Sequence, residues 1–267
     1  MSNFDRNVAA AGYGKSLTRA EAAVVDAGLR AYMLRIYNYM VLGLAITGFA
    51  ALGAYMLSVT SDPVSAARGV AALRNGLYLT PIGYALFVSP LKWLVIFAPL
   101  GLVFFLSFRI ESMAPAAAQF TFWAYAALVG ISLGVLFLVY TQTSIVRVFF
   151  ITAASFGALS LWGYTTQRDL SAMRSFLIMG LFGIIIASLV NIFLASSALQ
   201  WVVSVIGVVI FAGLTAWDTQ RLKTEYIYGS MEGDVLERSA IMGALSLYLD
   251  FLNLFTFLLQ LLGSRDE

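Results

Sequence analysis

Apolar and polar positions alternate along this chain in blocks long enough to cross a lipid bilayer. A helix needs about 20 consecutive apolar residues to cross the hydrocarbon layer. Seven apolar stretches of 18 to 24 residues cover residues 36–58, 91–108, 121–140, 148–165, 175–195, 200–217 and 239–262. The pattern predicts six spanning helices and a last segment that either spans or re-enters from the same side.

Polar and turn-forming residues separate these stretches. The breaks include Ser61-Asp62-Pro63, Arg109-Ile110-Glu111 and Gln167-Arg168-Asp169. The segment from Thr219 to Arg238 is predicted to be the longest charged loop, and residues 63–90 an external loop with some local structure. Small residues at Gly130 and Gly134 form a GxxxG motif, which allows two helix backbones to approach closely.

The first 34 residues are mixed in character and are predicted to form a cytoplasmic tail. Thr18 and Glu21 have the spacing of a capping box at a helix start. Val25, Leu29, Tyr32 and Ile36 follow as one apolar stripe at helical spacing. We expect an interfacial helix here, with a soluble helical tail as the alternative. The predicted domains are residues 1–34 (tail), 35–263 (membrane domain) and 264–267 (C-terminal tail).

Composition agrees with a membrane protein. The chain is 61% hydrophobic and only 11% charged, whereas soluble domains carry about 25% charged residues. Cysteine and histidine are both absent, which excludes disulfides, thiol chemistry and catalysis by histidine. The expected fold class is therefore all-α integral membrane. We expect the lipid bilayer as its environment, no cofactor, no enzymatic activity and no nucleic-acid partner.

The distribution of Lys and Arg predicts the orientation. One side of the predicted topology holds eleven of these residues, from Arg6 to Arg238. The other side holds four: Arg68, Arg74, Lys92 and Arg147. Loops rich in Lys and Arg remain in the cytoplasm, so the N-terminus is predicted to be cytoplasmic. The protein is expected in a bacterial inner membrane.

One ionisable residue lies near the middle of the last apolar stretch. Asp250 shares a helical stripe with Gly243, Ser246 and Asn253, and a leucine face is expected on the opposite side, facing outward. A charged residue inside a membrane is costly and therefore marks a candidate functional site. Gly243, Ser246 and Asn253 are candidate pore-lining residues, with a purely structural polar network as the alternative.

Two further charged residues lie at the ends of spans. Asp218 ends the sixth stretch, and antiparallel helices can bring it to Asp250, 32 residues later. Arg109 ends the second stretch on the same side and is a candidate counter-ion. Two carboxylates in a poorly solvated site titrate as a coupled pair, so their two protons are lost in two separate steps. Protonation would weaken their tie to the arginine and let the helices separate, and their oxygens suit transient binding of Ca²⁺.

Several motifs resemble those of the Bax inhibitor-1 family, specifically its bacterial branch. Ala244 to Phe255 resembles the C-terminal signature of that family, and Trp217-Asp218-Thr219-Gln220 resembles its aspartate motif. Val129 to Gly134 and Arg168-Asp169-Leu170 are similar to its third helix and to the loop after its fourth. The likeness covers about residues 30–263.

The resemblance implies a seven-helix bundle with a central polar C-terminal helix. It implies that Asp218 and Asp250 form a di-aspartyl pH sensor, with Arg109 as its latch. It also implies a pH-dependent leak of Ca²⁺, with Ca²⁺ and protons as ligands, and a role in stress protection. In some bacterial members it points instead to binding of a membrane-bound AAA protease.

Other functions fit less well. An intramembrane aspartyl protease also uses two aspartates, but Asp250 lies in Leu-Tyr-Leu-Asp, and the Gly-x-Gly-Asp motif of that class is missing. No internal repeat indicates a secondary transporter. A membrane regulator that binds a partner protein, with the aspartates stabilising the fold, remains the alternative to a leak channel.

Overall fold

The computed structural model describes residues 19–67, 73, 76–229 and 231–265, and the side chains from residue 25 onward. Within these residues, seven helical segments are long and apolar enough to cross a membrane. The fold class is therefore an all-α integral membrane bundle, as the sequence predicted.

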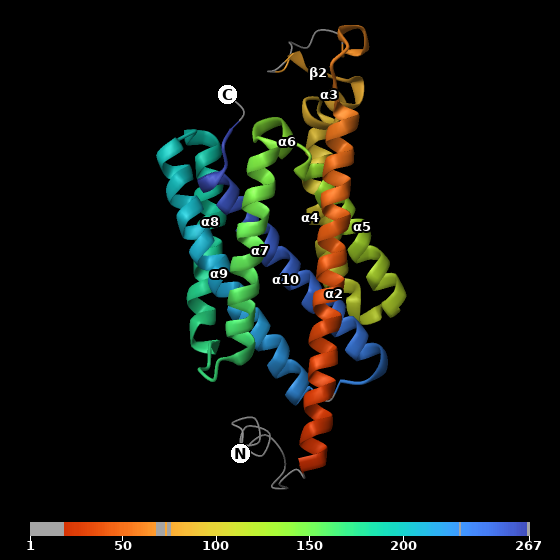
Figure 1. The fold of residues 1–267 in the computed structure, drawn as a ribbon, viewed down its shortest axis with the longest axis vertical. Coiled ribbons are helices and arrows are strands. Elements are labelled where there is room, and N and C mark those ends of the chain that lie inside the picture. The colour runs from red at the N-terminus through yellow and green to blue at the C-terminus, as the bar shows by residue number, and fades with distance from the viewer. Residues whose placement is uncertain (1–18, 68–72, 74–75, 230, 266–267) are drawn as a thin grey trace.

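The spanning helices follow one another up and down along the chain (Figure 1). They are α2 (Arg19–Ser58), α4 (Leu91–Arg109), α5 (Pro115–Leu133) with the short α6 (Leu136–Val139), α7 (Gln142–Thr165), α8 (Arg174–Leu194), α9 (Ser197–Tyr228) and α10 (Gly233–Leu262). The 3₁₀ turns η3 (Ile110–Ser112) and η4 (Ser171–Met173) lie in two of the connections.

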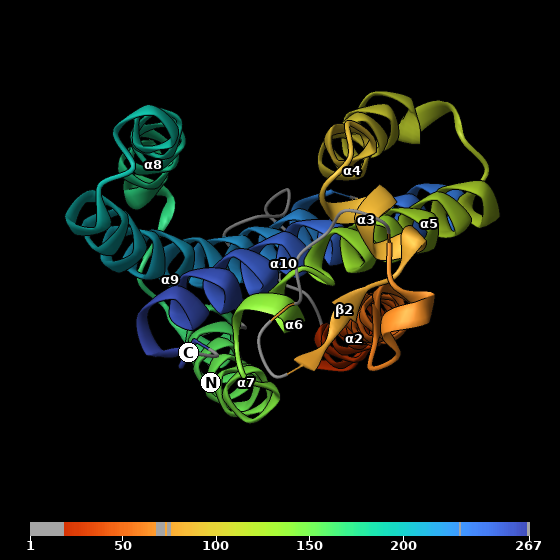
Figure 2. The ribbon, with the colours of Figure 1, turned by 90° about the horizontal axis from the view of Figure 1, so that it is seen from above.

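Helix α10 lies at the centre of the bundle. It packs against α9, α2, α7 and α5, while α8 rests on α9 and α4 rests on α5. Figure 2 shows α8 and α4 at the outside of the molecule. Helix α10 also crosses from one end of the bundle to the other, and its C-terminal end meets the start of α7, where the Thr141 amide donates to the Ser264 carbonyl. The last segment therefore spans the bundle and does not turn back.

Two predicted segments differ from the observed helices. Helix α2 runs unbroken from residue 19 to residue 58, so the expected interfacial helix and the first span form one continuous helix. Thr18, half of the predicted capping box, lies outside the described residues. The segment from Thr219 to Arg238 is mostly helical, because α9 continues to Tyr228 and α10 begins at Gly233. Its charged residues, apart from Glu232, lie on helix ends that extend beyond the apolar stretches.

A small folded unit joins α2 to α4. Strands β1 (Val59–Thr60) and β2 (Tyr78–Leu79) pair antiparallel, and they are accompanied by the 3₁₀ turn η1 (Pro63–Ser65) and the helix α3 (Pro81–Phe87). The Thr80 hydroxyl accepts a hydrogen bond from the Gly83 amide and caps α3. This is the local structure expected between residues 63 and 90.

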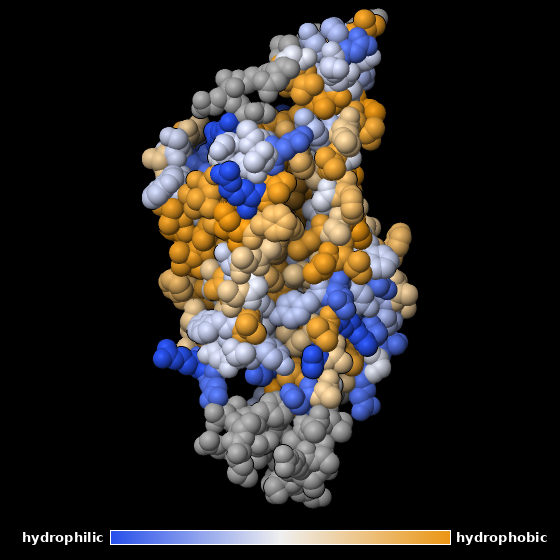
Figure 3. Space-filling model, viewed as in Figure 1, coloured by the Kyte–Doolittle hydropathy of each residue, from blue (hydrophilic) through white to orange (hydrophobic). Residues whose placement is uncertain are grey.

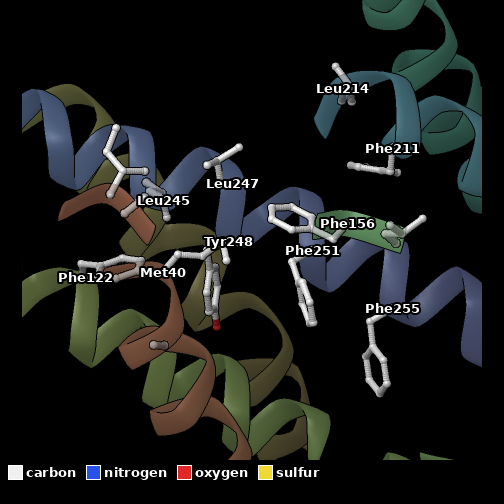
Figure 4. Close-up of a cluster of buried hydrophobic side chains, with 14 of the residues drawn as sticks. Met40, Phe122, Phe156, Phe211, Leu214, Leu245, Leu247, Tyr248, Phe251 and Phe255 are labelled. Carbon is white, nitrogen blue, oxygen red and sulfur yellow. The ribbon is translucent and has the colours of Figure 1, made fainter. Parts of the chain in front are cut away.

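The buried core forms around α10. Tyr248 packs edge-on against Phe122 and Tyr125 of α5, and Phe251 packs against Phe156 of α7 (Figure 4). The Tyr248 hydroxyl lies 2.6 Å from that of Thr47 on α2, which also donates 2.9 Å to the Ala126 carbonyl. Three helices are therefore joined inside the core by one buried hydroxyl pair.

The leucine face predicted on α10 does not point outward. Leu245 and Leu259 are buried, and Leu249 and Leu252 are only partly exposed. The reason is the central position of α10, which is covered on several sides by other helices. The outer surface is instead supplied by residues such as Phe176, Phe193 and Phe49 of the surrounding helices. Figure 3 shows hydrophobic residues across the middle of the molecule and hydrophilic residues toward its ends.

Glycine sets the spacing between α2 and α5. A Cβ at Gly130 would lie 2.6 Å from the Cβ of Ala50 and 2.5 Å from the Thr47 carbonyl oxygen. Gly134, one turn later, faces Ala54 and Ala51 of the same helix. The predicted GxxxG motif therefore forms a close helix contact.

Candidate functional site

Asp250 lies in the interior of the bundle. It is the eighteenth of the thirty residues of α10, and it is only 4% exposed. Its neighbours Phe251 and Leu254 belong to the hydrophobic core. A carboxyl group in such surroundings needs a hydrogen-bonding or charged partner to offset its loss of hydration.

The partner of Asp250 is Asp218. Helices α9 and α10 run antiparallel and are joined by a connection of only four residues, 229–232. Asp218 is also buried, with 7% of its surface exposed, and its carboxyl group lies close enough to that of Asp250 for the two groups to interact. An ionised carboxylate can only accept hydrogen bonds, so a hydrogen bond between the two groups would require a proton on one of them. The structure places Asp218 and Asp250 side by side, and their role as a pH sensor stays a prediction.

The positive charge beside the pair comes from Arg221. Its Nη2 lies 2.7 Å from Asp218 Oδ1 and donates 3.2 Å to the Ser246 hydroxyl of α10. Its Nε is also 3.8 Å from a carboxylate oxygen of Glu225. Arg221 therefore neutralises Asp218 within α9 and connects α9 to α10 beside the aspartate pair.

The assignment of Arg109 as the latch needs correction. Arg109 is exposed at the end of α4, and α4 packs on α5, on the far side of α10 from α9. Among the described residues, the ion pair to Asp218 is made by Arg221. Arg221 lies three residues after Asp218, a spacing that places two side chains on one helix face. That signal was missed because residues 219–238 were assigned to a loop.

The position of Arg221 also changes the expected mechanism of gating. Arg221 and Asp218 belong to the same helix, so their ion pair does not hold two helices together. The contacts between α9 and α10 here are the shared carboxyl contact and the Arg221–Ser246 hydrogen bond. A change of protonation therefore acts on the helix interface chiefly through the two aspartates.

Of the three candidate pore-lining residues, only Ser246 joins this site. The Asn253 side chain donates 2.8 Å to the Leu249 carbonyl of its own helix. Gly243 is buried against Leu222 of α9 and Ile36 of α2. None of the three lines the cavities described for this protein. Gly243 is therefore a packing position in this arrangement of the helices.

A chain of hydroxyl groups approaches the site from α2. The Tyr37 hydroxyl lies 2.5 Å from that of Ser160 on α7, which lies 2.9 Å from that of Thr219 on α9. Thr219 follows Asp218 directly in the sequence. Sequence reasoning missed this network, because three isolated hydroxyl residues on three helices carry no pattern along the chain.

The two aspartates offer a limited set of metal ligands. In the part of the chain that the structure describes, no group of three or more His, Cys, Asp or Glu side chains could hold a metal ion. Two carboxylates supply at most four oxygens, whereas Ca²⁺ takes about six to eight. The chemistry of this donor set suits a passing cation that keeps part of its water shell better than a firmly held one.

Residues 29–267 match the family described as inhibitor of apoptosis-promoting Bax1. The inner membrane protein YbhL of Escherichia coli strain K12 is 43% identical over 241 residues, which are 90% of this chain and 94% of the relative. An uncharacterized protein of Rickettsia prowazekii is 44% identical over 96% of this chain and 99% of its own length. A third relative, from Caulobacter vibrioides, is 42% identical over the whole length of both chains.

Proposed function

The chain belongs to the Bax inhibitor-1 family of membrane proteins, and we propose that it forms a pH-sensitive leak for Ca²⁺, gated by Asp218 and Asp250. The observation that carries this proposal is the contact of two buried carboxyl groups across the α9–α10 interface, with one guanidinium beside them. On this proposal the protein is a passive conductor and not an enzyme. The end of the bundle at which α2 begins faces the cytoplasm.

The gate works through the number of protons on the pair. With one proton, the two carboxyl groups share a hydrogen bond between α9 and α10. With none, two negative charges face each other in a poorly solvated site, and the single Arg221 guanidinium cannot offset both. With two protons, the ion pair to Arg221 loses its charge. Each state exerts a different force between the helices, so the population of open bundles depends on pH.

Ca²⁺ is the transported ion in this proposal, and it passes the aspartate pair. The carboxylate oxygens of Asp218 and Asp250 are hard ligands that suit a hard cation. Their small number favours rapid release, which conduction requires.

The test is Ca²⁺ flux into dye-loaded proteoliposomes between about pH 5 and pH 8. Wild type is compared with Asp218→Asn and Asp250→Asn, which keep the shape of the side chain and remove its titration. The matched control is Asp234→Asn, which removes an exposed carboxylate from the first turn of α10. We expect wild type and the control to show pH-dependent flux, and either site variant to make the flux independent of pH.

Flux no greater than that of empty liposomes, from correctly folded wild-type protein, would refute the leak. The leading function would then be binding of a partner in the membrane, such as a membrane-bound AAA protease in stress protection. The aspartate pair would serve only to join α9 to α10.

A further inference from the structure

A large polar cavity opens at the end of the bundle where α7 passes into α8. It has a volume of about 1430 Å³ and lies between the end of α7, the connection 166–173, the start of α8 and the last turns of α9. Its charged lining comprises four cations and two carboxylates: Arg168, Arg174, Arg221, Lys223, Asp169 and Glu225. The lining therefore carries two more positive charges than negative ones.

Three of these cations have no acidic partner in the described part of the chain. The ion pairs there involve Arg221 and Arg35, and none includes Arg168, Arg174 or Lys223. The Arg174 guanidinium lies over the Trp217 ring at 5.7 Å, and Arg221 lies over the same ring at 5.1 Å. Both guanidinium groups therefore pack on Trp217, which also lines the cavity.

The connection that carries Arg168 is held in place by α9. The Gln220 side chain accepts a hydrogen bond of 2.8 Å from the Leu170 amide and donates one of 2.8 Å to the Arg168 carbonyl. This pair of bonds ties the backbone on both sides of Asp169 to α9. The cavity wall is therefore shaped before any ligand binds, which lowers the cost of binding.

The cations suit a phosphate group. Guanidinium groups form two parallel hydrogen bonds with phosphate oxygens, and they are less strongly hydrated than ammonium groups. The four cations outnumber the acidic groups beside them, so an anion with at least one negative charge is attracted into the cavity.

The edge of the cavity meets the apolar surface of α8. Arg174 and Ser175 line the cavity, and the next outward-facing residues are Phe176 and Met179, with 59% and 68% of their surface exposed. Helix α8 packs on α9, and its outer side remains free for contact with lipid among the described elements. An anion that carries apolar chains can therefore place its charge in the cavity and its chains along α8.

We propose that this cavity binds the phosphate headgroup of an anionic phospholipid, with Arg168 and Arg174 as its principal contacts. Basic pockets between membrane helices at the cytoplasmic surface bind lipid headgroups of this kind. Aromatic side chains such as that of Trp217 are favoured at the membrane–water interface.

Arg221 connects this cavity to the aspartate pair. Its guanidinium lines the cavity and also lies 2.7 Å from Asp218. A bound phosphate competes with Asp218 for that guanidinium, so lipid binding shifts the gate. This consequence rests on the proposed function, whereas headgroup binding itself does not.

The experiment measures binding by calorimetry, with the full chain in detergent micelles. The probes are short-chain phosphatidylglycerol, short-chain phosphatidylcholine and inorganic phosphate. The test variant is Arg168→Gln/Arg174→Gln, and a second variant, Arg168→Lys/Arg174→Lys, keeps the charge. The matched control, Lys92→Gln/Arg147→Gln, removes two cations from the opposite end of the bundle. Each basic residue beside an anionic headgroup contributes about fivefold in affinity.

We expect wild type to bind phosphatidylglycerol at least about tenfold more tightly than phosphatidylcholine. The glutamine variant should lose about twenty-fivefold in affinity for phosphatidylglycerol, while the lysine variant and the control retain the preference. Equal affinity for the two lipids would overturn the proposal. So would a preference that survives in the glutamine variant. Inorganic phosphate binding as tightly as phosphatidylglycerol would assign the cavity to a free anion and overturn the lipid assignment. Because the readout is binding, it is independent of the flux that tests the proposed function.

Discussion

The guanidinium of Arg221 lies 2.7 Å from the carboxylate of Asp218, one turn earlier on the same helix. This places the compensating charge of the aspartate site within α9 itself. The ion pair can therefore persist while α9 and α10 change their separation. At the aspartate site, movement at the interface would break the carboxyl contact with Asp250 and the hydrogen bond to Ser246.

Removal of the Arg221 charge should destabilise the bundle. Arg221→Gln leaves Asp218 buried without its cation, and we expect the free energy of unfolding to fall by about 2 kcal/mol. This is less than for a fully buried pair, because the Arg221 side chain is 35% exposed. Denaturant unfolding in detergent measures the change. Arg109→Gln, at an exposed position, should change stability little, and a larger loss there than in Arg221→Gln would contradict the assignment.

Alanine substitution should affect stability differently at two glycines, one inside the close contact between α2 and α5 and one outside it. Gly130→Ala places a Cβ against Ala50 and Thr47, and we expect it to destabilise the protein by about 1–3 kcal/mol through overpacking. Gly101 lies on α4, and a Cβ at this position would have no atom within 4 Å. Gly101→Ala should be neutral or stabilise by up to about 1 kcal/mol, because alanine favours the helix. Thermal unfolding measures the change in melting temperature of each variant. Equal changes in the two variants would argue against the close contact.

The buried hydroxyl pair in the core should contribute measurably to stability. Tyr248→Phe keeps the ring packing and removes the hydroxyl that lies 2.6 Å from Thr47. We expect a loss of about 1 kcal/mol. Tyr84→Phe, on a side chain that is 41% exposed, is the control and should have no effect beyond error. Indistinguishable unfolding curves for the two variants would show that Thr47 is satisfied by the backbone carbonyls alone.

The connection between α7 and α8 should respond to acid. The hydrogen bond from the Ser171 amide, 2.8 Å long, holds the pKa of Asp169 below its ordinary value of 3.8. Because the pKa is lower in the folded state, the group stabilises the fold above its ordinary pKa. That contribution is lost as the pH falls through the lower folded value. The stability difference between wild type and Asp169→Asn should therefore shrink below about pH 4. A difference that stays constant from pH 6 to pH 2 would contradict this.

The membrane fold could be predicted from the apolar stretches, because every helix that crosses the hydrocarbon layer needs about 20 apolar residues. Five of the seven stretches lie within one observed helix, and the other two, 121–140 and 175–195, each end one residue beyond a helix. Helix ends were harder to predict. The extension of α9 from residue 217 to Tyr228 lies beyond the apolar stretch, where amphipathic packing and not hydropathy decides whether the chain stays helical.

The sequence alone determined that this chain is a helical membrane protein, that Asp250 lies in an apolar span and that an antiparallel pair of helices can bring Asp218 to it. These conclusions depend on local hydrophobicity and on chain connectivity, both of which are present in the order of residues. Only the tertiary structure decided which arginine neutralises the pair, which face of α10 is covered and which cations gather around Trp217. Those outcomes depend on how helices rotate and pack against one another, and the spacing of residues within a single helix does not specify them.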